Sequence, residues 1–163
     1  IMKKKIIIAL SVLLLVIATS AISLAVNNAV VENNKKKTPS DYKIGISYEQ
    51  ALENKDAKPV LALFYVDWCG YCLRFMPKYK TVNTIYKNKY SVVMLNVEDP
   101  KNKDLVEKVK ITGFPTLYIL DPKYDNYVLL NNAFYLDLAR LREELDRYLR
   151  IRKLLDAGSK CGK

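Results

Sequence analysis

The sequence predicts an α/β domain in which a central β-sheet is flanked by helices, and three observations support this fold class. Residues 60–66 are an unbroken apolar run bounded by Pro59 and Asp67, which is typical of a strand buried on both faces. Residues 91–97 and 116–120 predict two further strands. Segments with helical spacing separate these strands, so that strands and helices alternate along the chain.

An apolar segment near the N-terminus predicts export. Three consecutive lysines, residues 3–5, precede residues 6–26, in which only three serines and one threonine interrupt the apolar side chains. A lysine-rich flank followed by such a stretch is typical of an export signal. The stretch is also long enough to span a bilayer as a helix. Residues 1–26 are therefore predicted to be either a cleaved signal peptide or a retained N-terminal membrane anchor.

The N-terminal segment also predicts a location. Lysines next to an apolar span stay preferentially in the cytoplasm, so the remainder of the chain is expected on the far side of the membrane. This location is extracytoplasmic, either periplasmic or in the cell envelope. A retained anchor would tether the protein to the inner membrane with its N-terminus inside. Residues 27–41 are polar, contain three consecutive lysines, and are predicted to be a linker.

The first helices follow from capping and spacing. Residues 47–50, Ser-Tyr-Glu-Gln, fit a capping box and predict a short helix that ends near Lys55. A longer helix is expected over residues 69–87, directly after the strand at 60–66. Residues 104–109 are predicted to be a short helix with its leucine and two valines on one side.

The C-terminal part predicts a hairpin and a closing helix. Residues 122–126 contain the turn residues Pro, Asp and Asn, and residues 127–130 are expected to pair back as a strand. Apolar residues spaced three and four apart from Leu138 to Leu149 predict an amphipathic helix. The predicted folded domain covers residues 42–155, and residues 156–163 are expected to be a flexible tail.

Charge and composition exclude several classes of function. The formal net charge is +10, and six lysines and one glutamate place +5 of it in residues 1–37. The remaining +5 is spread over 126 residues as mixed acidic and basic side chains, which indicates a solvated surface and no nucleic-acid partner. The sequence contains no histidine, which excludes Cys–His and Ser–His catalysis and the commonest metal ligand.

Cys69-Gly70-Tyr71-Cys72 follows the buried strand and opens the long predicted helix. A helix N-terminus presents unpaired N–H groups and a positive dipole, which favour a thiolate. Two cysteines three residues apart on a helical turn are also close enough for a disulfide. Cys69 is therefore expected to attack and Cys72 to resolve. The alternative is half of a structural zinc site, but such sites need four ligands and only Cys161 remains, so no metal is predicted.

The segment Trp68-Cys69-Gly70-Tyr71-Cys72 resembles the active site of the thioredoxin superfamily. Pro77 and the run Gly113-Phe114-Pro115-Thr116 add to the resemblance, which covers about residues 42–155. It implies a thioredoxin-like fold with a central mixed β-sheet flanked by helices, preceded here by the apolar export or anchor helix. In that family the first proline kinks the active-site helix, and the second is a cis-proline that faces the cysteines.

The resemblance also implies a substrate-binding region. With Pro115 in the cis form, the backbone of Phe114 can pair with an extended segment of a substrate. Trp68, Gly70 and Tyr71 are expected to complete this region next to the redox-active disulfide Cys69–Cys72. For Trp68 the alternative is an ordinary core side chain.

The sequence departs from the family in two places. Many members carry a buried acid six residues before the first cysteine, where this chain has Leu63, so assistance to proton transfer by that acid is absent. Gly70-Tyr71 also stands where typical reducing thioredoxins have Gly-Pro, and the direction of electron transfer stays open. Cys161 is interpreted as an incidental thiol, with intermolecular pairing as the alternative.

These observations predict an exported thiol–disulfide oxidoreductase that exchanges its cysteine pair with protein thiols and disulfides. No cofactor is predicted, because the two sulfurs carry the electrons. A redox partner of the opposite state must regenerate the pair. The alternatives are a disulfide isomerase and a thioredoxin-like binding module with little turnover.

Overall fold

The computed structural model describes residue 17 and residues 36–161. Residues from Thr38 onward form one compact unit. The predicted apolar helix and most of the predicted linker lie outside the described residues, apart from Ile17 and the residues after 35. Among the helices that the structure describes, none combines the length and apolar character needed to cross a membrane.

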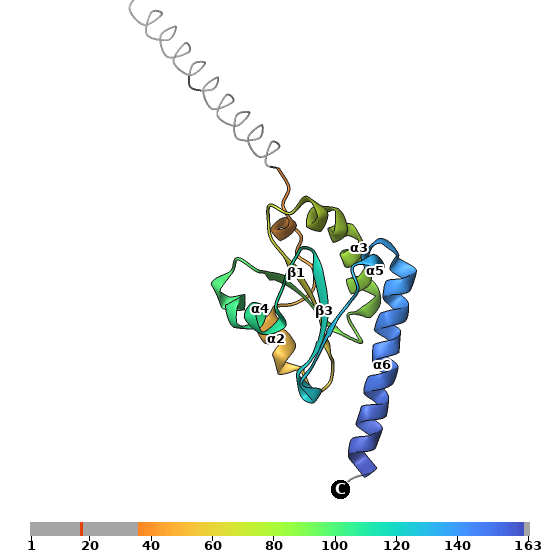
Figure 1. The fold of residues 1–163 in the computed structure, drawn as a ribbon. Coiled ribbons are helices and arrows are strands. Elements are labelled where there is room, and N and C mark those ends of the chain that lie inside the picture. Colours follow the sequence, from red (N-terminus) through yellow and green to blue (C-terminus); the bar gives the residue numbers. More distant parts are fainter. Residues whose placement is uncertain (1–16, 18–35, 162–163) are drawn as a thin grey trace, which may run out of the picture. The chain divides into compact units, whose positions relative to one another are not determined.

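A four-stranded mixed sheet with the order β2-β1-β3-β4 forms the centre of this unit (Figure 1). β1 pairs with β2 in parallel and with β3 antiparallel, and β4 pairs antiparallel with β3. This confirms the predicted fold class for the domain. The strands are β1 (Val60–Tyr65), β2 (Ser91–Asn96), β3 (Thr116–Asp121) and β4 (Asn126–Leu129).

Helices cover both faces of the sheet. Figure 1 shows α2 and α4 on one side, and α3, α5 and α6 on the other. The apolar side chains form one cluster on each side, which is the reason that helices are needed on both. The helices are α2 (Tyr48–Glu53), α3 (Gly70–Tyr86), α4 (Lys103–Val109), α5 (Ala133–Leu136) and α6 (Leu138–Cys161), and short 3-10 turns are η1 (Pro39–Asp41), η2 (Pro100–Asn102) and η3 (Pro122–Tyr124).

The six residues of β1 are all buried, as the unbroken apolar run predicts. Alternate side chains of a strand point to opposite faces. Leu61, Leu63 and Tyr65 therefore join the cluster on the α3 and α6 side, whereas Val60 and Phe64 join the cluster on the α2 and α4 side. A strand with both faces buried does not alternate apolar with polar residues along its sequence. Its packing on both faces also fixes the position of its C-terminal end, which the cysteines follow.

Local patterns in the sequence predict most of the places where the elements begin and end. The capping box is present, because Ser47 Oγ accepts from the Gln50 N–H while Gln50 Oε1 accepts from the Ser47 N–H. The predicted helix at 69–87 is α3, and the predicted hairpin after residue 121 is formed by β3 and β4. The ends of the other predicted elements differ from the structure by one or two residues, as fraying and capping lead one to expect.

Two segments differ from the predictions. Residues 38–41 were expected in the linker, yet η1 packs on the domain, with Pro39 buried and Ser40 hydrogen-bonded to Asp67. The helix α6 also runs on through residues 156–161, where the sequence predicts a flexible tail. Its last turns are held because Lys123 and Tyr124 both contact the Asp156 carboxylate. In both places a contact with a distant residue orders a segment whose own composition is polar.

Candidate functional site

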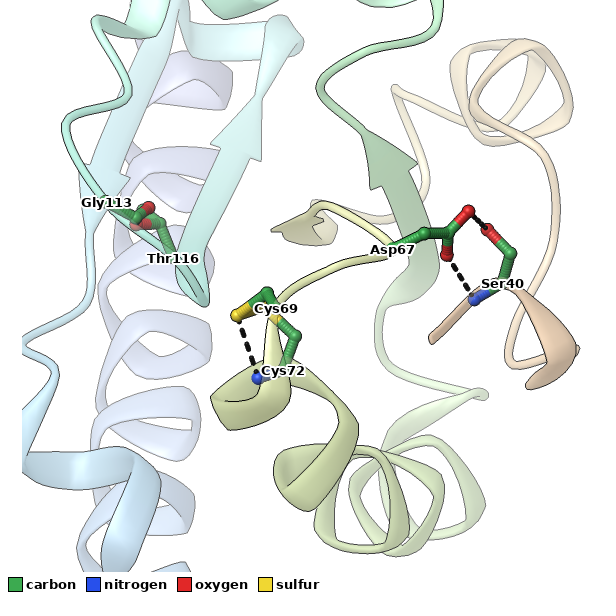
Figure 2. The surroundings of a disulfide bond; sticks show 6 residues. All are labelled: Ser40, Asp67, Cys69, Cys72, Gly113 and Thr116. Carbon is green, nitrogen blue, oxygen red and sulfur yellow. Dashed lines mark hydrogen bonds between the residues drawn. A yellow bond between two sulfur atoms is a disulfide. The ribbon is translucent and has the colours of Figure 1, made fainter. Parts of the chain in front are cut away.

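The cysteine pair lies where β1 leads into α3. Cys69 is the N-cap residue of α3 and Cys72 lies in its first turn, and the two form a disulfide with Cα atoms 5.2 Å apart (Figure 2). The Cys72 N–H donates to Cys69 Sγ at 3.1 Å. Cys69 is 8% exposed and Cys72 is fully buried. Cys69 thus keeps a small accessible area, whereas Cys72 keeps none.

The surroundings of Cys69 Sγ favour negative charge on that atom. The sulfur accepts a backbone N–H of the first helical turn, and the positive end of the α3 dipole points toward it. Once the disulfide is reduced, the same two features stabilise a thiolate there. That Cys69 attacks and Cys72 resolves stays a prediction.

The loop before β3 lies across from the cysteines, and Figure 2 labels its residues Gly113 and Thr116. The Phe114–Pro115 peptide bond is cis, as the resemblance implies. The Thr116 hydroxyl donates to the Gly113 carbonyl at 2.7 Å, which closes the loop on itself. Thr116 then pairs with Phe64 of β1, so the sheet carries both the loop and the cysteines.

Trp68 is a surface residue with 72% of its side chain exposed, which rules out the core alternative. Its indole Nε1 donates to Glu98 Oε1 at 2.9 Å. Its ring also makes an edge contact with Phe114, with 6.0 Å between the ring centroids. Trp68 thus joins the loop before Cys69 to the cis-proline loop and to the segment after β2. Sequence reasoning missed Glu98, because nothing near it in the chain marks it as a partner.

Asp67, two residues before Cys69, links the active-site loop to η1. Its carboxylate accepts from the Ser40 N–H and the Ser40 hydroxyl, both at 2.9 Å (Figure 2). The Ser40 hydroxyl lies 3.1 Å from the Tyr65 hydroxyl. These bonds connect η1 to the two residues that flank Val66 at the end of β1. The sequence carries no signal for this contact, because 27 residues separate its two ends.

A groove of about 1170 Å³ lies along the cis-proline loop and reaches Tyr71, between the two cysteines in the chain, although neither cysteine lines it. Of the predicted substrate-binding residues, Tyr71, Phe114 and Pro115 line it. Trp68 and Gly70 are not among its lining residues, although Trp68 contacts Phe114. Gly70 has open space at its Cα, with no heavy atom within 4 Å of a Cβ placed there. The structure therefore brings three of the five predicted residues into one groove and leaves two at its border.

Apolar residues surround the two cysteines in the core, and position 63 carries no carboxylate. Leu63 is fully buried in the same cluster as Cys69 and Cys72. Within the described part of the chain, no three His, Cys, Asp or Glu side chains gather as metal ligands would.

Comparison with known proteins agrees with this geometry. Residues 41–131 match the family model described as Thioredoxin. The chain belongs to the thioredoxin family. As a thioredoxin-family protein with a Cys-x-x-Cys disulfide at a helix N-terminus, it falls in the class of thiol–disulfide oxidoreductases, which confirms the predicted enzyme class.

Relatives of this thioredoxin-family chain include longer proteins. It is 43% identical over 65 residues to protein disulfide isomerase-like 2-2 of Oryza sativa subsp. japonica, covering 40% of this chain and 17% of that protein. It is 36% identical over 98 residues to protein disulfide-isomerase 1 of Dictyostelium discoideum, covering 56% of this chain and 26% of that protein. The chain thus spans about a sixth to a quarter of the length of these relatives.

Among solved structures, the J-Trx1 fragment of ERdj5 resembles the chain in fold. The TM-score is 0.52 at 14% sequence identity, covering 66% of this chain and 51% of that one. At this identity the likeness concerns the fold alone.

Proposed function

We propose that this protein is an exported thiol–disulfide oxidoreductase that exchanges the Cys69–Cys72 pair with protein substrates. One observation supports the proposal above the others. The two cysteines form a disulfide at the N-terminus of α3, across from the cis-proline loop, and only Cys69 of the two keeps some accessible area. A structural disulfide needs neither the helix N-terminus nor a neighbouring groove.

In the reducing direction, the Cys69 thiolate attacks one sulfur of a substrate disulfide. A mixed disulfide forms, and the other substrate sulfur leaves as a thiolate. The Cys72 thiolate then attacks Cys69 Sγ and releases the second substrate sulfur, so that the pair ends oxidised and the substrate has gained two electrons. The reverse sequence oxidises a substrate dithiol. The Cys72 proton must leave before the second attack, and this step depends on the surroundings of a buried sulfur.

Neighbouring residues position the substrate. The backbone at Phe114, next to a proline that offers no N–H, pairs with an extended substrate segment and aligns its disulfide with Cys69. Tyr71 borders the same groove, and Trp68 supports Phe114 from the other side. Gly70 leaves room for the substrate at the first residue of the helix. These are proposed binding roles, and the two sulfurs are proposed to carry the chemistry.

The roles of the two cysteines can be tested by trapping. We expect Cys72→Ser to accumulate a mixed disulfide with substrate proteins through Cys69, since the resolving sulfur is then missing. Cys69→Ser should accumulate none, because its remaining sulfur is buried. Both variants should be made in a Cys161→Ser background and analysed by mass spectrometry. Equal trapping by the two variants would contradict the assignment.

The direction of electron transfer decides between a reductant, an oxidant and a disulfide isomerase. The reduction potential of the pair distinguishes a reductant from an oxidant. An assay of disulfide reduction with dithiothreitol separates all of these from a binding module, which would not turn over. Whatever the direction, a redox partner of the opposite state is needed to regenerate the pair.

We further propose that residues 1–26 direct export, as a signal peptide or as a membrane anchor, and that residues 27–37 link them to the domain. The support is the lysine-rich flank and the apolar stretch. A phosphatase fused after Lys37 should be active, because the enzyme folds only outside the cytoplasm. An inactive fusion with the protein stable in the cytosol would contradict this location.

A further inference from the structure

The groove along the cis-proline loop carries a charge pattern of its own. Three basic side chains line it, Arg74 and Lys78 from α3 and Lys110 from the residue after α4. Among the described residues that line the groove, none is Asp or Glu. Elsewhere the domain surface mixes both signs and pairs many of them, as Lys89 with Asp146 illustrates. The described lining of the groove therefore carries net positive charge, close in the chain to the cysteine pair because Tyr71 stands between Cys69 and Cys72.

The basic side chains of the groove come from two segments of the chain. Arg74 lies with its guanidinium carbon 4.5 Å from the centre of the Tyr71 ring, and this stacking leaves the edge of the guanidinium open to further hydrogen bonds. Lys110 is exposed and directly follows α4, a helix that covers the opposite face of the sheet from α3. A segment lying in the groove would thus meet positive charge from two different elements.

The lining also includes apolar and aromatic residues. Phe75, Leu130 and Tyr135 are buried, and Tyr135 is held because its hydroxyl accepts from the Leu117 N–H and donates to the Leu130 carbonyl. Leu129 and Tyr71 stand at the border with 58% and 71% of their side chains exposed. Such a lining accepts apolar side chains, while the basic residues can bind carboxylates at its rim.

We propose that this groove binds an extended acidic segment of the substrate protein, next to the cysteine that Cys69 attacks. The proposal rests on the proposed oxidoreductase function and adds the substrate class. Charge complementarity determines the occupant, because three cations with no carboxylate among them attract a segment rich in Asp and Glu and repel a basic one. The segment is extended because the cis-proline loop that borders the groove offers its backbone to a strand.

Three disulfide-bonded peptides of one length provide the test, with the flanking residues Glu and Asp, Gln and Asn, or Lys and Arg. The full-length protein, reduced beforehand, should reduce the acidic peptide about tenfold faster than the neutral one at low salt, with the basic peptide slowest. The variant Lys78→Gln/Lys110→Gln should bring the ratio of the acidic-peptide rate to the neutral-peptide rate close to one. Lys80→Gln, an exposed lysine of α3 outside the groove, is the matched control and should keep the preference.

Binding without chemistry separates this proposal from the proposed function. The variant Cys69→Ser/Cys72→Ser should bind a linear acidic peptide in calorimetry more tightly than its neutral counterpart, and added salt should weaken that binding. Equal binding of the acidic, neutral and basic peptides would overturn the substrate class, even if every disulfide peptide is reduced. Reduction of none of them would overturn the oxidoreductase function instead. Dimerisation of the protein that blocks peptide binding would show that a second copy occupies the groove, which also contradicts the proposal.

Discussion

At the residue scale, the loss of the Cys72 proton is the step of the reaction that the neighbouring side chains assist least. Cys72 is fully buried, and Leu63, in the same cluster, is fully buried as well. Apolar surroundings disfavour a charged sulfur, and leucine can accept no proton. Many family members are expected to carry an acid at this position, so Leu63 is the residue whose replacement is most informative about the second half of the reaction.

We predict that Leu63→Glu resolves a preformed mixed disulfide faster than the natural protein near neutral pH, because a carboxylate can take the Cys72 proton. The same change should lower the free energy of unfolding by about 2–5 kcal/mol, since leucine packing is lost and an unpaired carboxyl enters the core. Stopped-flow measurement of the single resolution step on folded protein checks the rate. Leu63→Gln is the control, with similar size and no proton acceptor. Equal rates for the two variants would show that Leu63 is an ordinary core residue.

At the element scale, the C-terminal half of α6 is attached to the sheet by a buried ion pair. Arg152 Nε donates to Asp121 Oδ2 at 2.7 Å, and both side chains are almost inaccessible to solvent. The remaining guanidinium nitrogens donate to the Ala57 and Asp56 carbonyls at 3.1 and 2.9 Å. One side chain therefore joins α6, the end of β3 and the loop before β1. Asp121 Oδ1 is buried and has no hydrogen-bond partner among the described residues, whereas Oδ2 also accepts from the Tyr148 hydroxyl at 3.2 Å.

We predict that Arg152→Met lowers the free energy of unfolding by about 3–5 kcal/mol, because it leaves a buried carboxylate without its partner. Arg147→Met on the same helix is the matched control. Arg147 pairs with Glu144 in an exposed position, so its loss should change stability by less than about 1 kcal/mol. Denaturant unfolding measures both variants. Asp121→Asn/Arg152→Met should regain part of the loss, whereas no recovery would mean that the carbonyl contacts of Arg152 matter more than the ion pair.

At the scale of the whole molecule, buried tyrosines link stability to alkaline pH. The chain has 12 tyrosines, and several insert their hydroxyls into the core. Burial raises the pKa of Tyr135 to about 12. Burial, together with the negative charge of Asp121, raises the pKa of Tyr148 to about 12. Burial raises the pKa values of Tyr79 and Tyr90 further above their ordinary value.

A raised pKa means that the folded chain keeps phenol protons that the unfolded chain loses above about pH 10. Unfolding then releases protons, so stability is constant below this pH and falls as the pH rises toward the folded pKa values. We predict a fall of about 1.4 kcal/mol per pH unit for each such tyrosine between about pH 10 and 12. Urea unfolding of the oxidised protein at a series of pH values measures this slope.

In Tyr90→Phe, the free energy of unfolding should fall less steeply between about pH 10 and 12, by the contribution of one buried tyrosine. The reason is that the Tyr90 hydroxyl is buried and donates to the Leu145 carbonyl. Tyr71→Phe is the control, because that residue is 71% exposed. A slope that is the same in the two variants would contradict the link between burial and alkaline unfolding.

The sequence by itself determined the order of the elements and the place of the cysteine pair. Both depend on local physics. An apolar run of six or seven residues predicts β1, a capping box starts α2, and Cys69 must be near a helix N-terminus because a helical pattern follows the strand. The family motif added the cis form of Pro115, which the structure confirms. The short helix α5 escaped prediction, because four residues carry too little periodicity to recognise.

The tertiary structure alone decided which distant residues surround the site. Glu98 binds the Trp68 indole, Ser40 holds Asp67, and Lys110 lies in the same groove as Lys78. Each of these contacts joins segments that the sheet order β2-β1-β3-β4 brings together. Hydropathy and spacing describe a residue's own element, whereas the neighbours across elements depend on strand pairing and on how the chain crosses between layers. For this reason the cysteine pair could be identified from the sequence. The set of charged residues that lines the groove could not.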